Sequence, residues 1–237
     1  MKTNLLEFLN QDKLYNLETE GQYGIPIIKP VYEIPNIEHY NWIGFNEVLS
    51  CKKPYNSMVH FMVHDYQFER VWNSLDKYTN VLKKHPLIVT PDFSSFVDSP
   101  KALQIWQCYR ANAVGAYWQS KGLTVIPKVG WCDESTYDFV FDGLPKDSIV
   151  CISTLGFLNN RQYTEWFKNG YEEMKKRLTP KEILCYGRIP EWLKDEVTEM
   201  GCRVTRFDSF NQVKGISDEE YYKLLGVWYD IYIHTIV

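Results

Sequence analysis

The sequence predicts an α/β fold: a single domain in which repeated strand–helix units surround a mostly parallel sheet, open or partly barrel-like. Short apolar runs, typical of strands covered on both faces, alternate with amphipathic segments about five times between residues 57 and 208. This alternation is typical of parallel sheets with crossover helices. The chain has 237 residues, slightly fewer than the roughly 250 of a full eight-stranded barrel.

The first 56 residues differ in composition from the rest of the chain. A short helix is expected at 5–9 and a short strand at 42–45. Between them, Pro26, Pro30 and Pro35 exclude both a helix and a central strand. The sequence therefore predicts that residues 1–56 form a helix and a proline-rich arm packed on the body, and that residues 57–237 form the α/β domain.

The strands of that domain are expected where apolar residues cluster between turn residues. They are predicted at 58–63, 87–89, 123–126, 148–152, 183–186 and 203–207, and the C-terminal tail adds a helix at 218–225 and a strand at 228–233.

The helices are expected where apolar residues recur at spacings of three and four. They are predicted at 65–84, 100–121, 135–141, 161–178 and 191–200. In the helix at 100–121, Ser99 is the expected cap and Gly122 the terminating residue. Its buried face is predicted to carry Ala102, Ile105, Trp106, Tyr109, Ala113, Ala116 and Tyr117. Ser135 is the expected cap of the short helix that follows.

The composition restricts the class of protein. A net charge of −4 and a pI near 5.8 argue against a general nucleic-acid binder, which is usually basic, although a local basic patch remains compatible with these values. The six cysteines form no CxxC motif, so no zinc knuckle is expected. Several lie in predicted strands or a helix, where a free cysteine packs as a small apolar residue, and no disulfide is expected in a cytoplasmic protein. No apolar run approaches the length of a membrane span, and the N-terminus lacks a signal peptide. We therefore expect a reduced, cytoplasmic protein.

Candidate functional residues follow the strands, because ligands of parallel α/β folds bind beyond the carboxyl ends of the strands. Asp92 follows the strand at 87–89 and precedes the next helix by too many residues to cap it. Asp65 follows the strand before it, beside His64, and has an alternative role as a helix cap. Such carboxylates could act as acid and base or hold a divalent cation, so Asp92 and Asp65 are the catalytic candidates.

Anion-binding candidates occupy equivalent positions after later strands. Lys128 and Arg188 carry the charge, and Trp131 lies nearby in the sequence. Ser153 and Thr154 would cradle a phosphate if their segment opened a helix. The chain has no GxGxxG, GxxxxGK[ST] or GxSxG motif, so the common dinucleotide, P-loop and nucleophile-elbow sites are not supported.

Several motifs together resemble one family. They are HDYQFERVWN at 64–73, TPDFS at 90–94, QIW at 104–106, YR at 109–110, GAYWQSKGLTVIP at 115–127, FDG at 141–143 and STLG at 153–156. The sequence is similar in these motifs to domain of unknown function 4417, a family of phages, prophages and mobile elements. The resemblance covers most of residues 57–187. It implies an accessory protein of a phage or mobile element, and it implies no mechanism. Positions that match the family include Asp92, Trp106, Arg110, Trp118 and Trp131.

Two hypotheses follow for the function. The first is a phage or mobile-element accessory protein that binds, and in one version hydrolyses, a small phosphorylated or nucleotide-like ligand. Asp92 and Asp65 would be catalytic, and Lys128, Trp131, Ser153, Thr154, Arg188 and Arg110 would bind the ligand. The second is a non-enzymatic interaction protein that inhibits or redirects a host factor, with the aromatic residues and the proline-rich arm as its interface. A binder of single-stranded nucleic acid is disfavoured by the net charge.

Overall fold

The parallel strands of this protein neighbour one another in chain order. The computed structural model describes residue 7 and residues 9–158, 160–194 and 201–209. One sheet has the order β3 (Asn41–Gly44), β4 (Ser57–His60), β5 (Leu87–Val89) and β6 (Val125–Ile126), and the other has the order β7 (Ile149–Ser153), β8 (Glu182–Tyr186) and β9 (Arg203–Phe207). All neighbouring strands within these two sheets are parallel.

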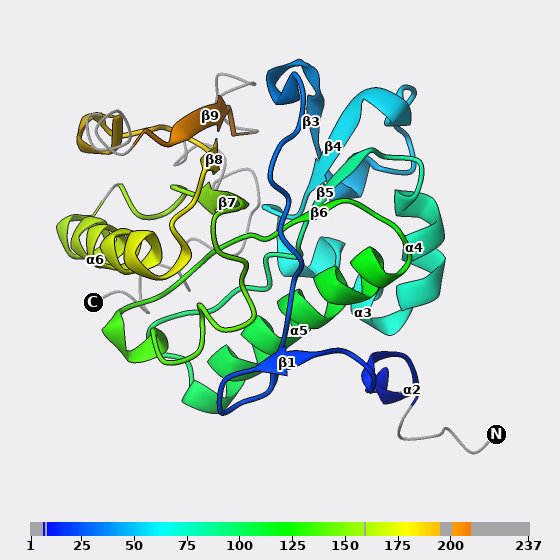
Figure 1. Ribbon diagram of the computed structural model, residues 1–237, viewed down its shortest axis with the longest axis horizontal. Coiled ribbons are helices and arrows are strands. Elements are labelled where there is room, and N and C mark those ends of the chain that lie inside the picture. Colours follow the sequence, from blue (N-terminus) through cyan, green and yellow to red (C-terminus); the bar gives the residue numbers. More distant parts are fainter. Residues whose placement is uncertain (1–6, 8, 159, 195–200, 210–237) are drawn as a thin grey trace.

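A single parallel bridge between Lys128 and Cys151 joins the two sheets. Val129 N–H donates to the Cys151 carbonyl and Cys151 N–H donates to that of Pro127, both at 2.8 Å. The strands therefore form one curved surface (Figure 1). In the described part of the chain no strand pairing joins β3 to β9, so the barrel is not closed. The predicted α/β fold around a mostly parallel sheet is confirmed, and the described strands do not form a closed barrel.

Aromatic rings lie between the two unpaired edges of this surface. Trp42 of β3 stacks on Phe207 of β9, with 4.2 Å between ring centroids, and on His60 of β4 at 5.1 Å. Tyr186 of β8 lies 4.7 Å from His60. We call these four residues the aromatic seam. The rest of the concave side is filled by Met58, Leu87, Val89, Ile126, Ile149, Cys151 and Leu184.

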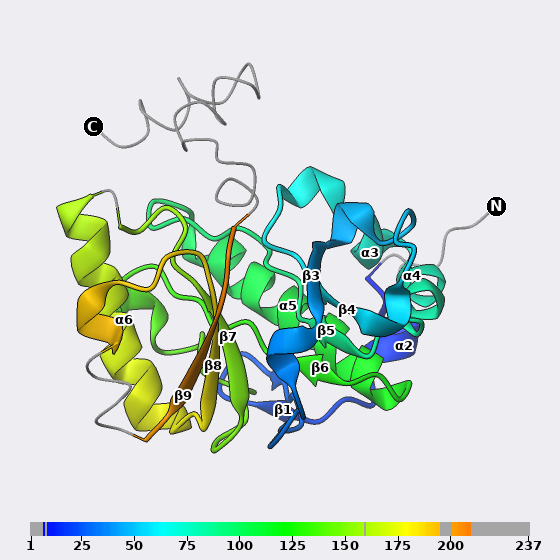
Figure 2. The same cartoon turned by 90° about the horizontal axis from the view of Figure 1, so that it is seen from above.

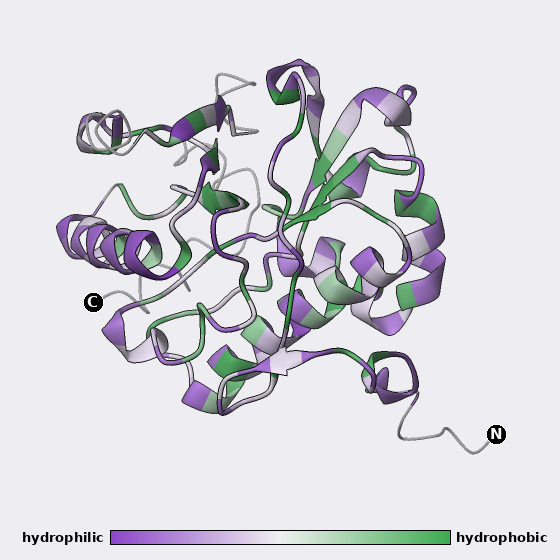
Figure 3. Cartoon of the chain, viewed as in Figure 1, coloured by the Kyte–Doolittle hydropathy of each residue, from purple (hydrophilic) through white to green (hydrophobic). Residues whose placement is uncertain are grey.

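Helices cover the convex side of each sheet (Figures 1 and 2). The short helices α3 (Arg70–Asn73) and α4 (Leu75–Leu82) and the long α5 (Lys101–Ser120) pack outside the first sheet. Helix α6 (Arg161–Leu178) packs outside the second. In Figure 3, β5 and β6 are green, whereas the visible side of α6 is mostly purple, as expected for a helix that buries its other face.

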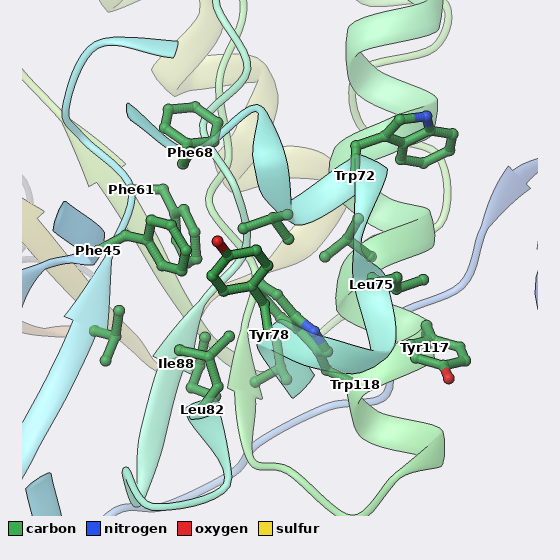
Figure 4. Close-up of a cluster of buried hydrophobic side chains, with 14 of the residues drawn as sticks. Phe45, Phe61, Phe68, Trp72, Leu75, Tyr78, Leu82, Ile88, Tyr117 and Trp118 are labelled. Carbon is green, nitrogen blue, oxygen red and sulfur yellow. The ribbon is translucent and has the colours of Figure 1, made fainter. Parts of the chain in front are cut away.

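The apolar cluster outside the first sheet is centred on aromatic rings (Figure 4). Trp118 of α5 is 0% exposed and stacks on Phe61 at 5.6 Å. Tyr117, its neighbour, turns its hydroxyl outward to donate a hydrogen bond to Asp76. Burial on α5 therefore centres on its second half. Ala102 is exposed, and Trp106 and Tyr109 are half-buried and pack against the margin of the same cluster. The first half of this helix is therefore less buried than predicted, and the prediction for Ala102 is wrong.

The N-terminal region reaches the body as an extended arm. After a short helix, α2 (Gln11–Leu14), strands β1 (Thr19–Glu20) and β2 (Ile25–Pro26) pair antiparallel. The chain then runs along α5, where Lys29 N–H donates to Gln119 Oε1 at 2.7 Å. It reaches β7, where Ile149 N–H donates to the Val31 carbonyl at 2.8 Å. The first 56 residues also contribute β3 to the sheet.

Two predicted helices differ from those observed. The helix expected at 65–84 is a 3-10 turn (Asp65–Gln67) followed by α3 and α4, because Ser74 adopts a non-helical conformation (φ −145°, ψ 55°). Serine disfavours helix interiors because it competes for backbone hydrogen bonds. The helix expected at 135–141 is one 3-10 turn (Glu134–Thr136), capped by Asp133 instead of Ser135.

Smaller differences concern helix caps and element lengths. Pro100, not Ser99, occupies the N-cap of α5. The strands predicted at 58–63 and 123–126 are shorter than expected. Most of the predicted helix at 191–200 and of that at 5–9 lies outside the described residues, as do both predicted tail elements. All six cysteines are free thiols.

Candidate functional site

A cavity of about 230 Å³ opens beyond the carboxyl ends of β4, β5, β6 and β7. We call it the carboxyl-edge pocket. Parallel α/β folds place ligand sites at this edge. Its walls combine polar and apolar side chains. The lining residues are Met62, Val63, His64, Asp92, Ser94, Lys128, Val129, Gly130, Trp131, Ser153, Leu155, Phe157 and Phe167.

An ion pair lies in the pocket wall. Lys128 Nζ, after β6, lies 2.5 Å from Asp92 Oδ1, after β5, and the two side chains are 19% and 22% exposed. The Lys128 backbone is held by its N–H, which donates to Thr90 Oγ1 at 2.8 Å. A Cβ on Gly130 would lie 2.4 Å from Lys128 Nζ. The lysine thus folds back over a residue without a side chain, and the pair presents a cation and an anion side by side.

Asp65 lies next to the pocket and fixes one of its loops. Its carboxylate accepts hydrogen bonds from the backbone N–H of Ser94 at 3.0 Å and from the Ser94 hydroxyl at 2.7 Å. Burial raises the pKa of Asp65, and the two bonds from Ser94 oppose that rise. His64 occupies the N-cap position of the 3-10 turn, and Asp65 lies in its first turn, so the predicted role of Asp65 as the cap is wrong. His64, its neighbour, lines the pocket.

Trp131 forms an apolar wall of the pocket. Its ring lies 5.3 Å from that of Phe167 and 6.2 Å from that of Phe141. The indole also lies flat against Gly170 of α6, where an added Cβ would come within 2.2–2.5 Å of three indole atoms. The indole N–H has no hydrogen-bond partner among the described residues. Gly170 thus sets how closely α6 approaches the pocket.

Gly170→Ala is expected to lower the free energy of unfolding by about 1–2 kcal/mol. Overpacking of a core typically costs about 1–3 kcal/mol, and better helix propensity returns up to about 1 kcal/mol. Urea titration followed by tryptophan fluorescence measures the difference. Asn169→Ala, at the exposed neighbouring position, is the control and should be neutral or slightly stabilising. A Gly170→Ala protein more stable than wild type would contradict the packing described here.

Ser153 and Thr154 have separate roles at the end of β7. Ser153 lines the pocket, and its Oγ accepts the Leu155 N–H at 3.3 Å. Thr154 is buried, and its hydroxyl donates to the Arg188 carbonyl at 2.9 Å. Helix α6 begins only at Arg161, and its cap is Asn160. The segment after β7 therefore does not open a helix, and the predicted phosphate cradle of that form is wrong.

Two predicted binding residues lie outside the pocket. Arg188 is exposed and lines a second cavity together with Trp192 and Arg206. Arg110 is buried on α5, where it pairs with Glu69 at 2.5 Å and lies 3.9 Å above the Phe93 ring. Of the predicted site residues, the structure brings together Asp92, Lys128, Trp131 and Ser153.

Further pocket residues had weak sequence signals or none. Phe157 follows β7 in a turn, and the sequence assigned Phe167 to a buried helix face. Gly130 carried no signal, since its role depends on the fold of the Lys128 side chain. Within residues 7, 9–158, 160–194 and 201–209, no three histidine, cysteine or acidic side chains are grouped to hold a metal ion. Asp65 and Asp92 do not converge on such a group.

The fold and pocket together define a parallel α/β protein with a mixed polar and apolar cavity at the carboxyl edge of its strands. The chain belongs to the family described as domain of unknown function (DUF4417), whose sequence model matches residues 17–206. The resemblance to this family expected from the motifs is confirmed.

Two curated relatives come from mycobacteriophages. The "Gene 1 protein" of Mycobacterium phage L5 is 35% identical over 173 residues, which cover 73% of this chain and 74% of the relative. The "Gene 1 protein" of Mycobacterium phage D29 is 34% identical over 172 residues, covering 72% of this chain and 63% of the relative, which is less than two thirds of it. This is therefore a member of a family found in phages.

No solved structure matches the chain. Among the helices of the described residues, none has the length and apolar character needed to cross a membrane.

Proposed function

We propose that this protein is a phage-type accessory protein whose carboxyl-edge pocket binds a small phosphorylated or nucleotide-like ligand. The observation that carries the proposal is the Asp92–Lys128 pair, mostly shielded from water in the pocket wall. A shielded ion pair contributes little net stability, because desolvation offsets much of the attraction. The pair lies at the carboxyl edge of the sheet, where parallel α/β proteins usually bind their ligands, and this position supports a role in binding.

The chemistry of the lining suits a ligand with an anionic and an apolar part. Lys128 supplies a cation for a phosphate oxygen, and the hydroxyl of Ser153, which accepts the Leu155 N–H, keeps its own proton as a donor. Trp131 and Phe157 give an apolar wall against which a planar group can pack. In the hydrolytic version of the proposal, Asp92 takes a proton from a water molecule whose oxygen forms a bond to phosphorus. The bond from phosphorus to the leaving oxygen breaks, that oxygen takes a proton from solvent, and Lys128 offsets the phosphate charge.

The ligand is expected to raise the melting temperature of wild-type protein and not that of a double variant, Asp92→Asn/Lys128→Gln. At a ligand concentration about 100-fold above Kd, the expected rise is about 5–10 °C for a chain of this size. The double variant removes both charges, so neither partner is left unpaired. The probes are a panel of nucleotides and sugar phosphates, each beside its dephosphorylated counterpart, in a thermal-shift assay.

The control is a second lysine–aspartate pair outside the pocket. Lys101 and Asp138 lie 2.9 Å apart on the surface, and Lys101→Gln/Asp138→Asn should keep the full response. A panel in which no phosphorylated compound stabilises wild type, or in which both double variants respond equally, would sink the proposal. Phosphate release by wild type but not by Asp92→Asn would support hydrolysis.

The alternative is a non-enzymatic protein that inhibits or redirects a host factor. It is supported by exposed apolar side chains between β5 and the first turn of α5, namely Phe96, Val97 and Leu103. This segment borders the loop that Asp65 holds through Ser94. A negative ligand panel would favour this alternative.

A further inference from the structure

The charges of this protein are segregated between the two ends of its strands. The residues just before β4, β5, β6 and β7 include lysines. The residues that follow β4, β5 and β6 are mostly acidic among the charged ones, and examples are Asp65, Asp98 and Glu134. The entering lysines are all exposed, and none has an ion-pair partner within the described residues. They are Lys52, Lys53, Lys83, Lys84, Lys121 and Lys146.

These lysines lie along one edge because the strands are parallel neighbours. Adjacent strands are about 4.8 Å apart, so the loops before successive strands place their charges side by side. We call this the amino-terminal edge; Figure 2 shows the strands from the side. Lys83, Lys84 and Lys121 follow helix ends, where the helix dipole favours a cation. That explanation does not extend to Lys52, Lys53 or Lys146.

The acids at this edge are mostly engaged elsewhere. Asp147 pairs with Lys181 at 3.7 Å, and Glu182 pairs with Arg203 at 2.6 Å. The charges of Glu33 and Glu38 act on Arg203 at the start of β9. Glu33 follows Tyr32 in the chain, so it is the acid of this pair that lies near the start of β7. A net positive surface therefore persists on a chain whose overall charge is −4.

Exposed tyrosines accompany the lysines. Tyr55 is 71% exposed and belongs to the 3-10 turn Pro54–Asn56 immediately before β4. Tyr32 is 68% exposed. It follows Val31, whose carbonyl accepts the N–H of Ile149 at the start of β7. Single-stranded nucleic acids bind where cations track the phosphates and aromatic rings stack on bases.

We propose that the amino-terminal edge binds single-stranded nucleic acid, with its lysines on the phosphates and with Tyr32 and Tyr55 stacking on bases. This site is separate from the carboxyl-edge pocket and does not depend on its proposed function. An anionic membrane is the less suitable partner, because interfacial binding uses an amphipathic helix and these lysines lie in short loops. The net charge of −4, on which the sequence-based expectation rests, averages over two opposite edges and does not describe this one.

Fluorescence anisotropy of a labelled oligothymidylate with the full-length chain tests the proposal. A length of about 20 nucleotides exceeds the 4–16 nucleotides of common single-strand sites. Wild type should bind, with affinity that falls as salt rises. In the variant Lys52→Gln/Lys53→Gln/Lys84→Gln/Lys146→Gln, affinity should fall at least about tenfold. The slope of log affinity against log salt should decrease by up to about 3, since each phosphate contact on a single strand contributes about 0.7.

Matched variants distinguish binding by the amino-terminal edge from a general effect of the protein's positive charges. Replacing Lys77, Lys101, Lys168 and Lys176 with glutamine removes the same charge elsewhere and should leave affinity within about twofold. Tyr55→Ala should weaken binding about tenfold and Tyr55→Phe should not, because phenylalanine still stacks. Labelled oligouridylate repeats the test for RNA. Absent binding at low salt, equal losses in both lysine variants, or binding to phosphatidylserine vesicles without binding to either oligonucleotide would overturn the proposal.

Discussion

Acidification is expected to reduce the free energy of unfolding through His60 by about 1.4 kcal/mol for each pH unit below pH 6.5. Burial lowers the pKa of this histidine from 6.5 to about 3 in the folded protein. Its Nδ1 accepts the Met62 N–H at 3.2 Å, so that nitrogen carries no proton and the imidazole ring is neutral. Trp42 and Tyr186 pack against the ring, so little water reaches it.

The direction of this pH effect follows from how the folded and unfolded states bind a proton at His60. Above pH 6.5 the ring is neutral in both states, and the full stability is present. Below pH 6.5 the unfolded chain binds a proton that the folded protein excludes, so stability is lost as pH falls toward 3. Over that window the loss from this one group is roughly 4–5 kcal/mol.

Denaturant titrations at a series of pH values measure this loss. His60→Phe keeps a ring in the aromatic seam but cannot be protonated. Its stability should be lower at pH 7, because Met62 N–H loses its acceptor, and its acid dependence should be weaker by about one proton. His39→Gln, at an exposed histidine, should keep the wild-type slope. A His60→Phe protein with the wild-type slope would show that His60 is not the group responsible.

Trp118→Ala is expected to cost about 3–5 kcal/mol, the usual range for truncating a large buried aromatic side chain. Its ring is 0% exposed, and it packs among Phe61 and the other rings of Figure 4. Removal leaves a cavity that helix α5 cannot fill, because the facing sheet fixes its position. The change in the free energy of unfolding, from urea titration at pH 7, gives the cost.

Trp106→Ala on the same helix is the matched comparison. Trp106 is half-buried and packs against the margin of the same cluster, 5.2 Å from the Trp72 ring. Its truncation should cost clearly less than that of Trp118. Equal losses would mean that the first half of α5 is buried as deeply as the second, contrary to the structure.

The sequence predicted the parallel fold and half of the site for identifiable reasons. Strands buried on both faces are short apolar runs, so β5 and β7 could be located. Asp92 and Lys128 could be placed because each immediately follows a strand, and neighbouring parallel strands bring such residues together. Arg188 met the same criterion and lies outside the pocket, because the direction of a side chain after a strand depends on the turn.

Other features depend on tertiary contacts that periodicity does not encode. The apolar spacing of three and four continues across Ser74, so the break between α3 and α4 left no gap in the pattern. Trp106 and Trp118 have similar sequence surroundings, and only the position of the sheet decides which is enclosed. Asp133 and Ser135 are both good capping residues. The backbone angles of the turn select Asp133.

The agreement between strand order and chain order has a consequence for biosynthesis. Each of β4 to β9 is bonded or bridged to the strand immediately before it in the sequence. A strand leaving the ribosome therefore meets a partner that has already been synthesised, and the sheet can grow one strand–helix unit at a time from the N-terminal side. Among the strands that the structure describes, none depends for its first pairing on a partner encoded downstream of it.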